Sequence, residues 1–266
     1  MPDYTDVRGN NLSVFKTPPR RIVSLVPSQT ELLYDLGLDK EVVGITKFCV
    51  HPTSWFQSKT RIGGTKNINL DKIKVLQPDL ILANKEENVK EQIEELANHF
   101  PVWVTDVNNL KEALDMIEAV GILTNKTATA THIKNGIAKN FDTLKQQLTF
   151  KPIRTCYLIW KDPYMTVGGD TFIHNMLQHA GFENIFSNKQ RYPEVTLELL
   201  QTMNCEVMLL SSEPYPFSEK HIAQLQLLLP KTRIMLVDGE MFSWYGSRLM
   251  HAPAYFTQLQ VQLQNS

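Results

Sequence analysis

The sequence lacks the features that would mark a membrane protein or a nucleic-acid-binding protein. No apolar run approaches the ~18 residues of a membrane span. The 27 Lys and Arg residues balance 28 Asp and Glu residues. The chain therefore has neither a basic stripe for nucleic acid nor a polybasic segment for a lipid surface. We expect no membrane span and no nucleic-acid partner.

Motifs of nucleotide, metal and covalent chemistry are also missing. The stretches "GGTKN" and "TVGGDT" are neither GxGxxG nor Walker A sequences. No CxxC, HExxH or GxSxG occurs, which removes the common zinc sites and the serine nucleophile elbow. Three cysteines are too few to indicate a disulfide framework. We expect no enzymatic activity and no intrinsic cofactor.

The first 21 residues are polar and lack the apolar stretch of a secretory signal. On this feature alone, the expected location is the cytoplasm if the chain is full-length.

Short apolar runs alternate with longer stretches of helical spacing. "RIVSLV", "VVGITKF" and "DLILAN" have the character of strands. In the helix expected after the first strand, Ser28 is the predicted N-cap, Glu31 completes a capping box and Gly37 stops the helix. The alternation predicts an α/β fold with mostly parallel sheets that helices cover on both faces.

The alternation breaks near residue 125 and restarts after Pro152. Between these points one apolar face runs at intervals of three and four residues, through Ala130, Ile133, Ile137, Phe141, Leu144 and Leu148. We therefore predict two Rossmann-like lobes, 1–125 and 151–266, joined by one long backbone helix over 126–150. A final helix is expected over 248–263.

One pattern occurs twice. "NLDKIKVLQPDLILAN" begins at Asn69, and "TLELLQTMNCEVMLLS" begins 127 residues later at Thr196. In each copy a polar cap precedes a leucine, then an acid, Asp71 or Glu198, and the copy closes on a run of four apolar residues. We interpret the repeat as a structural one between the two lobes. In both copies the acid would lie near the positive end of a helix.

Aromatic residues gather just after the predicted strands. In open α/β sheets, ligands bind outside the carboxyl ends of the strands. Three of the four tryptophans, Trp55, Trp160 and Trp244, follow such strands. Rings there would hold a large, flat, partly apolar ligand by stacking, and packing of the loops onto the sheets is the alternative role.

Cys49 and His51 lie two residues apart, so in extended backbone their side chains point the same way. Both residue types bind soft or borderline metals. Two ligands do not complete a zinc site. An axial bond to a metal carried by a bound ligand is one interpretation, and a packing or hydrogen-bonding role is the other.

These stretches together resemble a known family. The start "PS"–"TELLYDLGL", the stretch "NLDKIKVLQPDLIL", the single long helix and the second lobe resemble class III periplasmic binding proteins. These are the receptors of ABC importers for vitamin B12, ferric siderophores and haem. "CVHP", "GGTKN", "EEN" and "WYGSR" are similar to motifs of a branch of helical-backbone metal receptors. The resemblance extends from Arg20 to the C-terminus.

The resemblance implies a substrate-binding protein, periplasmic or lipid-anchored and monomeric, which binds a cobalt- or iron-bearing chelate between its lobes. It would deliver the chelate to a permease dimer, with Asp71 and Glu198 docking on one subunit each. A family tryptophan falls on Thr65, so the chelate stays open: a cobalamin or other corrinoid, a ferric siderophore or haem. The expected ligand contacts are Phe48, Cys49, His51, Trp55, Lys66, Trp160, Tyr192, Trp244, Tyr245 and Arg248.

A cytosolic enzyme or chaperone acting on tetrapyrroles is the alternative function. Chelatases use a comparable two-lobed α/β plan in which histidine and acidic side chains face the metal. Here His51 with Glu86, Glu87 or Glu240 would supply that set. The absent signal sequence favours this alternative, whereas no histidine–carboxylate pair has a diagnostic spacing.

Overall fold

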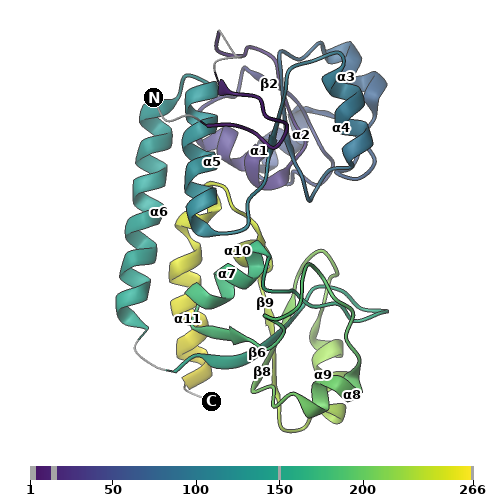
Figure 1. Ribbon diagram of the computed structural model, residues 1–266, viewed down its shortest axis with the longest axis vertical. Helices are drawn as coiled ribbons and strands as arrows, with labels where there is room; N and C mark the ends of the chain where they lie inside the picture. Colours follow the sequence, from purple (N-terminus) through teal and green to yellow (C-terminus); the bar gives the residue numbers. More distant parts are fainter. Residues whose placement is uncertain (1–3, 13–16, 149–150, 265–266) are drawn as a thin grey trace. The chain divides into compact units, whose positions relative to one another are not determined.

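A computed structural model describes residues 4–12, 17–148 and 151–264 of the chain (Figure 1). Its contacts divide the chain into two compact units. Unit 1 comprises residues 1–107, 111–137 and 245–248, and unit 2 comprises residues 108–110, 138–244 and 249–266. Each unit holds one parallel sheet, and the 21-residue helix α6 (Thr127–Gln147) contributes residues to both. The predicted α/β class with one long helix is confirmed, while the predicted lobe boundaries stay a prediction.

The sheet of unit 1 has five parallel strands in the order β3-β2-β1-β4-β5. Its central strands are buried along their whole length, as strands covered on both faces must be. The strands are β1 (Ile22–Ser24), β2 (Val42–Ile45), β3 (Thr60–Arg61), β4 (Leu80–Asn84) and β5 (Val102–Thr105). The helices are α1 (Pro27–Asp35), α2 (Thr53–Ser58), α3 (Leu70–Leu76), α4 (Lys90–Ala97), α5 (Leu110–Leu123) and the first half of α6.

The sheet of unit 2 has four parallel strands in the order β7-β6-β8-β9. The strands are β6 (Ile153–Leu158), β7 (Phe182–Asn184), β8 (Val207–Ser211) and β9 (Arg233–Val237). The helices are α7 (Phe172–His179), α8 (Leu197–Thr202), α9 (Glu219–Leu228), α10 (Glu240–Ser243) and α11 (Ala252–Gln264). A 3-10 turn, η2 (Ser247–Met250), precedes α11 and contributes residues to both units. The core side chains of β6 and β8 pack against those of α8 and α9.

The sequence repeat has the same local structure in both units. Helices α3 and α8 begin 127 residues apart, as do strands β4 and β8. Asn69 caps α3 by accepting the Lys72 N–H at 2.9 Å, and Thr196 caps α8 by accepting the Leu199 N–H at 3.2 Å. In both units the strand that follows is an inner strand of its sheet.

Two details of the helix predictions are wrong. Helix α1 begins one residue before Ser28, because Pro27 occupies its first turn and Val26 is the N-cap. The last helix does not run from 248, because Pro253 lacks an N–H and its ring hinders the preceding turn, so α11 begins at Ala252. Gly37 does end α1, with φ +72° and the paired backbone bonds of a Schellman turn.

Candidate functional site

Phe48, just after β2 in unit 1, presents an exposed ring. Half of its surface is accessible, at 50%, and the Lys47 ammonium lies 5.0 Å from the ring centroid. Gly64 lies beneath the ring, where an added Cβ would come within 3.2 Å of Phe48 Cε2. The glycine therefore lets the loop after β3 approach the aromatic face closely. Unit 1 thus carries a flat apolar surface at the carboxyl end of its sheet, with Val50 also exposed beside it in the chain.

Cys49 points into the core. Its Sγ lies 3.1 Å from Thr30 Oγ1 and 3.2 Å from Thr46 Oγ1. Burial raises the pKa of the Cys49 thiol to about 11, and the two hydroxyl contacts offset only part of this rise. The thiol is therefore protonated at neutral pH. Among the described residues, no three histidine, cysteine or acidic side chains gather closely enough to hold a metal ion.

Trp55 is 1% exposed. Its indole N–H donates to Asp39 Oδ1 at 2.6 Å, and Tyr34 meets it edge to face at 5.4 Å. The hydrogen bond from Trp55, with a smaller contribution from Lys59, lowers the pKa of Asp39. These contacts fit the alternative role of Trp55, in which its side chain packs α2 against the end of α1.

Lys66 lies in the exposed loop after β3. Its ammonium donates to the carbonyl oxygen of Glu86, and Gln92 Nε2 donates to the carbonyl oxygen of Lys66 at 3.2 Å. Asn88 adds a bond to the carbonyl oxygen of Thr65 at 3.1 Å. The loops after β3 and β4 are therefore joined, and they present the exposed side chain of Lys66 at the same end of the sheet as Phe48.

The segment 245–248 lies within unit 1, far along the chain from the rest of that unit. Tyr245 donates its hydroxyl to Glu87 Oε1 at 2.7 Å, and burial together with Glu87 raises the pKa of Tyr245 well above its ordinary value. Arg248 forms a two-pronged pair with Glu31, at 2.8 Å from Nε and 2.6 Å from an Nη. Gly246 makes this possible, because a Cβ there would lie 2.3 Å from the Ser28 carbonyl oxygen.

Trp160, after β6 in unit 2, is the second exposed ring among the predicted contacts, at 40%. Tyr215 supports it edge to face, with ring centroids 5.7 Å apart. The segment of Tyr192 pairs with the segment after Trp160 through bridges at Met165, and the backbone of Thr166 donates to Pro193 O at 3.0 Å. The structure thus brings the segments of Trp160 and Tyr192 together, and Tyr192 is half-buried.

Trp244 is buried, and its indole N–H donates to Glu213 Oε1 at 3.0 Å. Ser243 Oγ donates to the same oxygen at 2.6 Å. Burial raises the pKa of Glu213, and the nearby Glu240 and Asp238 add to this rise. The indole of Trp244 therefore provides a hydrogen bond to a buried carboxyl group in this structure.

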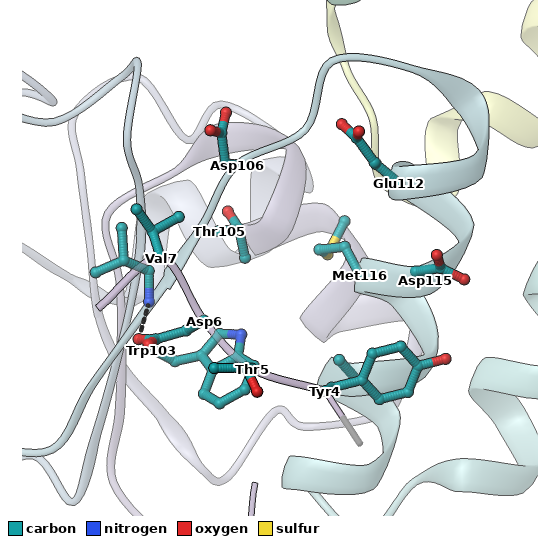
Figure 2. Close-up of a pocket in the computed structure, with 12 residues that line it drawn as sticks. Tyr4, Thr5, Asp6, Val7, Trp103, Thr105, Asp106, Glu112, Asp115 and Met116 are labelled. Carbon is teal, nitrogen blue, oxygen red and sulfur yellow. Dashed lines mark hydrogen bonds between the residues drawn. The ribbon is translucent and has the colours of Figure 1, made fainter. Parts of the chain in front are cut away.

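A cavity that the sequence did not indicate lies in unit 1 (Figure 2). Its volume is about 240 Å³, below the ~300 Å³ at which sites for drug-sized ligands begin. The N-terminal segment forms one wall, where Asp6 Oδ2 accepts the Val104 N–H at 3.0 Å. β5 and α5 form the others, with Trp103, Thr105, Asp106, Glu112, Asp115 and Met116. The cavity lies apart from the residues predicted to contact a ligand, none of which lines it.

Asp71 and Glu198 are both exposed in the first turns of α3 and α8. Hydrogen bonds from its own backbone N–H and from Thr196 lower the pKa of Glu198, so this carboxylate is ionised at neutral pH. Within the described residues, no helix combines the length and apolar character that a membrane crossing requires.

A profile of the family described as "Periplasmic binding protein" matches residues 22–227. The chain belongs to the periplasmic binding protein family. This is a family of transport binding proteins without enzymatic activity, so the prediction that the chain is not an enzyme is confirmed and the chelatase-like alternative loses its support.

Similar proteins agree with this assignment. A vitamin B12-binding protein of Vibrio parahaemolyticus is 24% identical over 211 residues, covering 78% of this chain and 76% of the relative. The structure of a periplasmic vitamin B12 binding protein of Vibrio cholerae is similar with a TM-score of 0.81, at 23% identity, covering 94% and 99%. That of a periplasmic heme-binding protein from Roseiflexus is similar with a TM-score of 0.78, at 18% identity, covering 92% and 98%. At these identities the structures show a shared fold.

Proposed function

We propose that this chain is the substrate-binding protein of an ABC importer for a metal chelate: a cobalamin or other corrinoid, a ferric siderophore or haem. The observation that carries the proposal is a pair of exposed rings, Phe48 after β2 and Trp160 after β6. Each ring lies at the carboxyl end of a parallel sheet, where α/β proteins bind ligands. The relatives and similar structures named for vitamin B12 and haem support the same ligand class.

The proposed ligand contacts are Phe48, Trp160, Tyr192, Lys66 and His51. Each exposed ring offers a face on which the flat part of the chelate would stack, and the Lys66 ammonium would meet its carboxylates. His51, partly buried after β2, is the better candidate for an axial bond to the chelate's metal, because the Cys49 thiol is buried and protonated. Trp55, Trp244, Tyr245 and Arg248 are left out of this set, since other side chains in their own unit hold them.

An absorbance titration with cyanocobalamin, haemin and ferric siderophores tests this proposal. Trp160→Ala and Phe48→Ala should each weaken binding of the recognised chelate roughly 10- to 100-fold, the equivalent of about 1.5–3 kcal/mol of lost ring contact. Leu227→Ala is the matched control, because it removes an exposed apolar side chain from unit 2 at the end of α9. Absence of binding to every chelate, or equal effects of all three variants, would reject the proposal.

We further propose that Asp71 and Glu198 dock the protein on its permease, and that it acts at the outer face of the membrane that holds the permease. Both acids are exposed, and they occupy equivalent positions in the sequence pattern that occurs once in each unit. One acid in each unit suits a permease dimer whose two subunits present the same basic pocket.

Uptake by vesicles that contain the cognate permease tests the docking role. Asp71→Arg or Glu198→Arg should abolish uptake and leave the Kd for the chelate unchanged, because neither acid lies at the carboxyl end of a strand. Asp142→Arg, the same charge change at another exposed acid, is the control and should transport normally. Uptake by either docking variant at the control's rate would exclude the role.

A further inference from the structure

A buried histidine packs against the aromatic platform of unit 2, by which we mean the exposed ring of Trp160 and the ring of Tyr215 that supports it. His221, on α9, is 4% exposed. Its Nδ1 accepts the backbone N–H of Ser218 at 2.9 Å, and its Nε2 lies 3.3 Å from the Tyr215 hydroxyl. Because Nδ1 accepts a hydrogen bond, the proton of the neutral ring is on Nε2, where it can be donated to Tyr215. The imidazole therefore joins the start of α9 to the loop after β8.

Ring contacts continue from His221 to the exposed tryptophan. The imidazole meets Tyr215 at 5.5 Å and Phe217 at 5.4 Å between ring centroids, and those two rings lie 4.7 Å apart. Tyr215 in turn supports Trp160 at 5.7 Å, with the planes inclined by 71°. The Tyr215 N–H also donates to Ile159 O at 3.3 Å, next to Trp160 in the chain. The orientation of Trp160 thus depends on Tyr215, and that of Tyr215 depends on His221.

Protonation of His221 would disrupt this arrangement. A cationic imidazole carries a proton on both nitrogens, so an Nδ1–H would face the Ser218 N–H, donor against donor, and its nearest acceptor would be Ser218 Oγ at 3.1 Å, which requires the ring to shift from its present contact. Burial lowers the pKa of His221 below its ordinary 6.5, and Lys220 on α9 and Lys161 after β6 lower it further, against smaller rises from the hydrogen bond with the Ser218 backbone and from Asp162. The ring is therefore neutral at pH 7.5 and gains its charge only in more acidic solution.

We propose that neutral His221 is a positioning residue of the ligand site, which holds Tyr215 and so presents the face of Trp160 to the chelate, and that its protonation withdraws this platform. The inference rests on the proposed chelate-binding function. It adds acid-triggered weakening of ligand binding, controlled by a side chain that itself touches no ligand.

A test of the platform that needs no ligand is the pH dependence of Trp160 fluorescence. The signal of Trp160 is obtained by subtracting the spectrum of Trp160→Phe, since three other tryptophans are present. Between pH 7.5 and 5.0, the emission and the acrylamide quenching of Trp160 should change with a midpoint below 6.5. His221→Asn keeps an acceptor for the Ser218 N–H but cannot titrate, so this change should disappear. A Trp160 signal that is constant with pH, or that titrates equally in His221→Asn, would overturn the proposal.

The effect on binding is read as the ratio of Kd at pH 5.0 to Kd at pH 7.5 for whichever of cyanocobalamin, haemin or ferric siderophore binds. If only the neutral form binds, Kd rises about tenfold per pH unit below the midpoint. We expect a ratio above 1 for the unchanged chain and a ratio of about 1 for His221→Asn. His179→Asn removes another histidine whose pKa burial lowers, on α7, and should keep the full ratio. A chelate that binds equally at both pH values would refute the role of His221.

Histidine ring NMR reads the tautomer of His221 in the unchanged chain directly. In the unchanged chain at pH 7.5, long-range ¹H–¹⁵N spectra should show His221 as the Nε2–H tautomer, assigned by the loss of its signal in His221→Asn. An Nδ1–H tautomer would contradict the hydrogen bond from Ser218 and end the proposal. Failure of every chelate to bind would reject the proposed function, whereas the fluorescence and NMR results would still decide whether His221 positions Trp160.

Discussion

Replacing Arg248 by methionine should destabilise unit 1 without weakening chelate binding. The guanidinium makes two charge-assisted hydrogen bonds to Glu31, and the two side chains are 13% and 18% exposed. Methionine retains most of the packed aliphatic stem of arginine, so the change isolates the loss of the ion pair. The carboxylate of Glu31 is left partly buried without this partner.

The expected magnitude follows from burial and geometry. Removing one partner of a fully buried pair costs about 3–5 kcal/mol, and exposed pairs contribute about 0–1 kcal/mol. A two-pronged pair that retains some solvent contact lies between these limits, so we expect Arg248→Met to cost about 2–3 kcal/mol. Glu31→Gln combined with Arg248→Met should be less destabilising than the sum of the single changes, by about 1–2 kcal/mol, because the unpaired charge is then removed.

Chemical denaturation followed by circular dichroism measures these free energies of unfolding. If the two units unfold in separate transitions, only the transition of unit 1 should shift. The free-energy changes of two mutations at independent sites add to within about 0.5 kcal/mol. A coupling energy below that value would therefore refute the reasoning. Unchanged stability together with a tenfold loss of chelate affinity would instead restore Arg248 to the ligand site.

Three further perturbations test other parts of the structure. Gly121→Ala should cost about 1–2 kcal/mol of unfolding free energy, because its Cβ would lie 2.2 Å from Ala130 Cβ. Ala130→Gly in the same chain should recover part of this loss. A Gly121→Ala chain more stable than the unchanged one would contradict the close packing of α5 on α6. Asn69→Ala and Thr196→Ala should each cost about 1 kcal/mol of unfolding free energy as lost helix caps, measured by thermal melting; no loss would exclude the caps. Burial raises the pKa of Glu213, so the unfolded chain loses this proton first and stability falls as the pH rises above 4.5. Glu213→Gln should therefore be more stable than the unchanged chain at pH 7 and not at pH 4, and an equal gain at both pH values would contradict the shift.

Local patterns in the sequence predicted most of the secondary structure. The apolar spacing through Ile133 and Phe141 requires only one continuous helix, and α6 runs from Thr127 to Gln147. Asn69 and Thr196 are caps because their side chains bond backbone groups three residues away. Such features depend on neighbours within one or two turns, which the sequence displays directly. The sequence did not indicate the short elements β3, β7, α2 and α10.

The sequence by itself determined the alternation of strands and helices, the long helix, the repeat with its two acids, and the family resemblance. Only the tertiary structure decided which residues at the strand ends face solvent. Phe48 and Trp160 do, whereas Trp55 and Trp244 are buried and donate hydrogen bonds to carboxyl groups. Arg248 and Tyr245 meet partners 217 and 158 residues away in the chain. The physical reason is that a position after a strand determines only at which edge of the sheet a residue lies. The direction of its side chain depends on contacts with segments that are distant in the chain.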